Sequence, residues 1–117
     1  MVDDVNDPAW PRDHITLDSA AVSASGRLRV YVTYGGGCEE HAAALLVSRA
    51  FMESNPPRLR ARVAHNGNGD HCEALISQMF EFALGPIQEH YQQTYASGNG
   101  TVVLMLDGIE ATYSFSN

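Results

Sequence analysis

The residues in this sequence best suited to chemistry are its two cysteines and the histidines beside them. Cys38 and Cys72 each follow a glycine-rich turn, Gly35-Gly36-Gly37 before the first and Gly67-Asn68-Gly69 before the second. Such turns allow two strand ends to approach closely, so a Cys38–Cys72 disulfide is the leading prediction. It would close a loop of about 35 residues and stabilise the fold by about 4 kcal/mol through the unfolded chain. In that role the cysteines are structural.

A metal site is the second interpretation. Cys38-x-x-His41 and His71-Cys72 together offer two sulfurs and two imidazoles, a ligand set that zinc accepts. The spacing is unfavourable, because adjacent residues on a strand point to opposite faces and the last two ligands would converge only in a loop. We therefore expect no cofactor, with zinc or copper at these four residues as the alternative.

A thiol-dependent enzyme is the third interpretation. If residues 39–52 form a helix in an α/β protein, its dipole would favour a nucleophilic thiolate at Cys38, with His41 as the base. The three glycines could also hold an anion with their backbone N–H groups. Against this, no C-x-x-C is present, and Glu39 and Glu40 would repel an anion. A non-enzymatic protein is favoured.

Five arginines suggest a binding surface. They alternate along two predicted strands, where Arg27 and Arg29 share one face and Arg58, Arg60 and Arg62 share another. If the two strands are neighbours, these side chains form a basic stripe that could hold an acidic protein or a glycan. The alternative is a solvated face whose arginines pair with acidic residues on adjacent strands.

Length and charge limit the kind of protein. The chain has 117 residues, 44% of them hydrophobic, and a formal net charge of −7. One domain is expected over residues 14–117, preceded by an acidic, proline-containing arm or linker over residues 1–13. The negative charge argues against nucleic-acid binding, and no apolar stretch is long enough to span a membrane. A disulfide favours an extracytoplasmic location (periplasmic, secreted or outer-membrane tethered), and a monomer is expected.

Hydrophobic periodicity predicts mainly β structure. Alternation is clearest in residues 27–34 and 58–65, and further strands are expected at 15–24, 101–106 and 109–115. Proline at the first position and apolar residues every fourth position predict one short helix near residues 86–96. Residues 39–52 are contested, since their composition favours a helix while a period of two also fits. The turn at 66–70 is of a type that joins hairpin strands.

A family resemblance bears on the segments whose secondary structure is ambiguous. It rests on four motifs: Tyr34-Gly35-Gly36-Gly37-Cys38-x-x-His41, Phe51-Met52-Glu53-Ser54-x-Pro56, Asn68-Gly69-Asp70-x-Cys72-Glu73 and Phe82-x-Leu84-x-Pro86. From about residue 27 onward the chain resembles short uncharacterised bacterial exported proteins, with the NigD-like domain as the nearest name. The resemblance implies an exported or lipid-anchored β-sandwich without enzymatic activity, in which residues 41–51 and 72–84 are extended.

Together these observations predict an immunoglobulin-like antiparallel β-sandwich of six or seven strands with one short helix. We expect it to be an exported, non-enzymatic binding or accessory module, stabilised by one disulfide, with a protein or glycan as partner.

Overall fold

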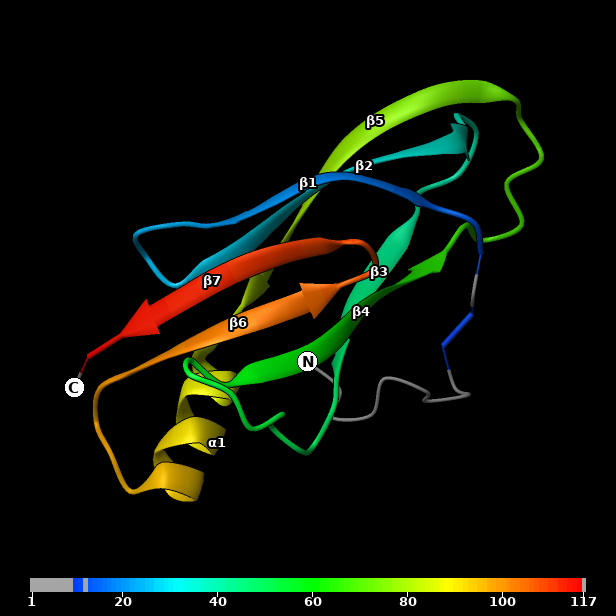
Figure 1. The fold of residues 1–117 in the computed structure, drawn as a ribbon. Coiled ribbons are helices and arrows are strands. Elements are labelled where there is room, and N and C mark those ends of the chain that lie inside the picture. Colours follow the sequence, from blue (N-terminus) through cyan, green and yellow to red (C-terminus); the bar gives the residue numbers. More distant parts are fainter. Residues whose placement is uncertain (1–9, 12, 117) are drawn as a thin grey trace.

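Two β-sheets face each other to form the body of the protein. The computed structural model describes residues 10–11 and 13–116, and in these residues seven strands and one helix are present (Figure 1). The first sheet has the order β1-β2-β5 and the second the order β3-β4-β6-β7. The bounds are β1 Thr16–Val22, β2 Arg27–Gly36, β3 Ala42–Val47, β4 Arg58–Asn66, β5 Ala74–Ala83, α1 Gly85–Tyr95, β6 Gly100–Leu106 and β7 Ile109–Phe115. The prediction of a β-sandwich with one short helix is confirmed.

The core lies between the two sheets. On β2, Leu28, Val30 and Val32 are almost inaccessible to solvent, while the residues between them are exposed or half-exposed. They face apolar side chains of the opposite sheet, among them Leu59 and Leu104. The alternation seen in the sequence therefore reports which side of β2 is buried.

Residues 42–47 form a strand, so the helix favoured by their composition is wrong. β3 pairs with β4 over six residues, from Ala42–Asn66 to Val47–Ala61. Its last three residues, Leu45, Leu46 and Val47, are buried. Burial and strand pairing outweigh the helix propensity of alanine and leucine, which amounts to only a few tenths of a kcal/mol per residue.

The topology differs in two ways from an antiparallel sandwich in which successive strands form hairpins. β4 and β6 run parallel, with Arg58–Arg60 paired to Val103–Met105, so the second sheet is mixed. The turn at 66–70 does not close a hairpin either. It leads from β4 in one sheet to β5 in the other. By contrast, β1–β2 and β6–β7 are the short antiparallel hairpins that their turns predict.

The helix α1 covers one end of the sandwich (Figure 1). Pro86 lies in its first turn and Ile87 is buried against the core. Tyr91 packs edge-on against Phe115, with ring centroids 5.1 Å apart. No helix among the described residues is both long and apolar enough to cross a membrane.

Most of the predicted N-terminal arm, residues 1–9 and 12, lies outside the described residues. Asp13 contacts the domain directly, since its backbone N–H donates to His65 O at 3.2 Å and its carboxylate accepts from Gly67 N–H at 2.7 Å.

Candidate functional site

Cys38 and Cys72 form a disulfide, with their Cα atoms 5.8 Å apart. The bond joins the turn after β2 to the loop before β5. Cys38 is bonded to Cys72 and precedes a strand, so the α/β arrangement with Cys38 at the N-terminus of a helix is not the one observed.

The glycine-rich turn holds an anion, and that anion is the protein's own Asp70. One carboxylate oxygen accepts hydrogen bonds from the backbone N–H groups of Gly37, Cys38 and Glu39 at 3.0–3.1 Å. The other accepts from Cys72 N–H at 3.0 Å. The Asp70 side chain has no solvent-accessible surface. Consecutive backbone N–H groups suit a negative charge, so the same two loops are joined covalently by the disulfide and electrostatically by Asp70.

Two buried histidines extend this network into the core. His41 Nε2 lies 2.9 Å from Asp70 Oδ2, and His41 Nδ1 lies 2.8 Å from His65 Nε2. His65 Nδ1 in turn contacts the backbone carbonyl of His14 at 3.1 Å. The ring of Tyr34 stacks on His41 with centroids 4.1 Å apart, and its hydroxyl donates to Gln78 Oε1.

The acceptor groups in this network determine which ring nitrogens of His41 and His65 must donate. A carboxylate and a carbonyl only accept, so the contacts of His41 with Asp70 and of His65 with His14 each need a ring N–H. The contact between the two rings needs a third N–H. That third N–H belongs to Nδ1 of His41 or to Nε2 of His65.

The surroundings shift two pKa values in the network. The hydrogen bond from His41 is the largest cause that holds the pKa of Asp70 well below its ordinary value, and the backbone N–H groups of Cys72, Glu39 and Cys38 act in the same direction. Burial works against them. For Tyr34, burial raises the pKa, and the charge of Asp70 raises it further. Each shift favours an ionised carboxylate beside a neutral phenol.

This network is built to stabilise the fold. All four ring nitrogens of His41 and His65 are engaged, and one end of the chain is a backbone carbonyl. Strand β4 could have revealed His65 in the sequence, because this residue shares the parity of the buried Leu59, Ala61 and Val63. No comparable pattern in the sequence indicates that the ring of Tyr34 stacks on His41.

Three of the four residues of the alternative metal site are engaged in other bonds. Of the four predicted ligands, Cys38 and Cys72 are joined to each other, and both nitrogens of His41 are hydrogen-bonded. Asp70 lies close to both cysteines, but disulfide sulfurs offer no thiolate to a metal. Of the predicted set, only His71 keeps its donors.

The five arginines do not form one stripe, because β2 and β4 belong to different sheets. On β2, Arg27 and Arg29 both pair with Glu81 of β5, at 3.4 and 3.0 Å. On β4, Arg58 pairs with Glu110 of β7 at 3.1 Å, while Arg60 and Arg62 lie on the same strand. Arg27, Arg29 and Arg58 thus follow the alternative of side chains paired with acidic residues on neighbouring strands.

Large apolar side chains are exposed on the outer face of the first sheet. Tyr31 on β2 lies directly opposite Met79 on β5, and these residues are 46% and 41% exposed. Leu75, four residues along β5 on the same face, is 80% exposed. We call these three residues the apolar outer face.

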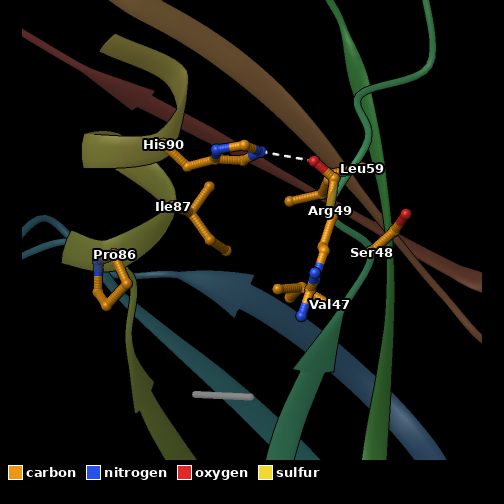
Figure 2. A pocket seen from close by; sticks show the side chains of 7 residues that line it. All are labelled: Val47, Ser48, Arg49, Leu59, Pro86, Ile87 and His90. Atoms are coloured by element: carbon orange, nitrogen blue, oxygen red, sulfur yellow. Dashed lines mark hydrogen bonds between the residues drawn. The ribbon is translucent and has the colours of Figure 1, made fainter. Parts of the chain in front are cut away.

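A pocket of about 400 Å³ lies where α1 meets the ends of β3 and β4 (Figure 2). Val47, Leu59 and Ile87 contribute apolar surface, and His90 reaches across from the helix to donate to Arg49 O at 2.7 Å. That hydrogen bond fastens α1 to the segment after β3. The pocket therefore marks the place where the helix is attached to the sandwich.

No protein-family model matches the chain, and no curated protein matches it either. Two solved structures share its fold. A NigD-like immunity protein from Bacteroides caccae superposes with a TM-score of 0.67 at 14% identity, covering 90% of this chain and 50% of that one. A protein of unknown function, DUF1344, from Bacteroides vulgatus gives 0.54 at 18% identity, covering 99% and 54%.

The chain shares its fold with about half of the NigD-like immunity protein. The resemblance noted in the sequence is confirmed at this level, and the chain spans about half the length of either neighbour.

Proposed function

We propose that this protein is an exported, non-enzymatic module that binds another protein through its apolar outer face. The observation that carries the proposal is the exposure of Tyr31, Leu75 and Met79 on one side of one sheet. Exposed apolar side chains grouped on a folded surface are typical of contact surfaces. Leucine and methionine suit the side chains of a protein better than a sugar, so a protein is favoured over a glycan.

The chemistry of the chain supports a binding role without catalysis or a cofactor. The two thiols are consumed by the disulfide, and the buried histidines are hydrogen-bonded on all their ring nitrogens. Export is supported by the disulfide, since such bonds persist in oxidising compartments and are rare in the cytosol. One structural neighbour is named an immunity protein, and we infer that this chain acts by contacting a partner.

Site-specific crosslinking in the producing cell tests the partner. A photoreactive residue is placed at Met79, and the control is placed at Thr112, which is exposed on β7 of the other sheet. We expect position 79 to give one defined adduct with a protein other than a second copy of this chain, lost when Tyr31→Asp is added, and position 112 to give none. Equal adducts from both positions, or none from either, would contradict the proposed surface.

Export is tested separately by fractionating those cells and treating each fraction with a thiol-blocking reagent. We expect the chain in the extracytoplasmic fraction with neither cysteine labelled. A cytosolic chain that carries two labels would refute export.

A further inference from the structure

We propose that two copies of this chain associate through the free edges of their β5 strands, in antiparallel orientation, to build one continuous six-stranded sheet. β5 is ten residues long and pairs with β2 at every residue, from Ala74–Gly36 to Ala83–Arg27. Among the described residues, no strand pairs with its other edge. Half of the backbone polar groups of β5 therefore face outward, as a template for a further strand.

This edge lacks the features that normally prevent strand addition. Proteins protect edges with prolines, lysines, bulges or very short strands. The segment Ala74–Ala83 contains no proline and no lysine, and its pairing with β2 has no register shift. The opposite edge of the same sheet differs, since β1 has a register shift between Leu17 and Ser19. Of the two edges, β5 is the regular and unprotected one.

The strand is complementary to itself. Its inward-facing residues include Ile76, Phe80 and Phe82, all half-buried and packed against the core. In an antiparallel pair, residues directly opposite share a face. A two-fold axis at Gln78 sets Ile76 opposite Phe80 of the second copy, and an axis at Met79 sets it opposite Phe82. Either register covers apolar side chains that one copy leaves partly open.

Charge on the strand does not oppose the pairing. Glu81 is the only charged residue of β5, and it is ion-paired with Arg27 and Arg29 of its own sheet. In the two registers it lies opposite Leu75 or Ser77, never opposite itself. The net charge of −7 on each copy repels at long range, but salt screens such repulsion beyond about 8 Å at physiological ionic strength. Association should therefore strengthen as salt is added.

Analytical ultracentrifugation of the purified chain tests the proposal, over a concentration series at low and moderate salt. We expect the sedimentation mass to approach twice 12.7 kDa. Glutamates at Ser77 and Met79 would meet like charges across either axis. They would face each other in the Gln78 register, and position 79 of the second copy and Glu81 in the Met79 register, so the Ser77→Glu/Met79→Glu variant should remain monomeric. The matched control is Ser19→Glu/Ala21→Glu, which adds the same charge at exposed positions of β1 and should still dimerise.

Opposite charges separate loss of the interface from loss of the fold. Mixing the glutamate variant with Ser77→Lys/Met79→Lys sets opposite charges face to face at these positions, so an equimolar mixture should restore the doubled mass. A wild-type chain that stays monomeric at every concentration, or a glutamate variant that dimerises like the wild type, would overturn the proposal. A mixture that fails to associate would do so as well. None of these measurements needs the external partner, so the result is independent of the proposed function. Dimerisation would replace the monomer expected from the sequence.

Discussion

Replacing Gly36 with alanine probes the network around Asp70 with a single methyl group. A Cβ atom at this position would lie 2.6 Å from Asp70 Oδ2 and 2.8 Å from His41 Nε2. Neither group can retreat easily, because the carboxylate is held by four backbone N–H groups and the imidazole is bonded at both nitrogens. The methyl group must therefore displace the contact between them.

The neighbouring Gly35 supplies a matched control. A Cβ atom there meets no atom within 4 Å. Both glycines lie in β2 and neither has a positive φ, so alanine suits the backbone at both positions. Each substitution also stabilises by reducing the freedom of the unfolded chain, by about 0.4–1 kcal/mol. Because that contribution is common to both variants, their difference isolates the steric effect.

The expected difference follows from the cost of overpacking a tight site, about 1–3 kcal/mol. We therefore expect Gly36→Ala to be less stable than Gly35→Ala by that amount in urea denaturation. With an unfolding entropy of about 2.1 cal/mol/K per residue, the melting temperatures should differ by roughly 4–12 °C. Equal stability of the two variants would refute the assignment of Asp70 and His41 to one rigid network.

Three further predictions concern the same region. Cys38→Ser/Cys72→Ser should lower the free energy of unfolding by about 4 kcal/mol, measured by urea denaturation against the oxidised wild type. Because the pKa of Asp70 is lowered on folding, the stability it confers is present above its ordinary value of 3.8 and is lost as the pH falls below it. Acid titration of stability should show this loss, and Asp70→Asn should remove it. Tyr34→Phe should cost about 1 kcal/mol by breaking its partly buried hydrogen bond to Gln78, whereas Tyr31→Phe on the exposed face should cost nothing measurable.

Much of the fold is visible in the sequence because local patterns report local geometry. The alternation of β2 and β4 identifies their buried faces, and Pro86 with its apolar repeat identifies the helix. The pairing of Cys38 with Cys72 needs no tertiary information, since two cysteines allow only one intramolecular disulfide. The strand alternation and the helix pattern depend on interactions within one element, and the disulfide has only one possible pairing.

Only the tertiary structure decided how these elements meet. The segment Ala42–Val47 has the composition of a helix and becomes a strand because β4 pairs with it and the core buries its end. The predicted arginine stripe required β2 and β4 to be neighbours, and no local pattern states which strands share a sheet. The anion held by Gly37 and its neighbours proved to be Asp70, more than 30 residues away along the chain. Strand partners and buried polar contacts depend on residues far apart in sequence, so periodicity within a single element does not encode them.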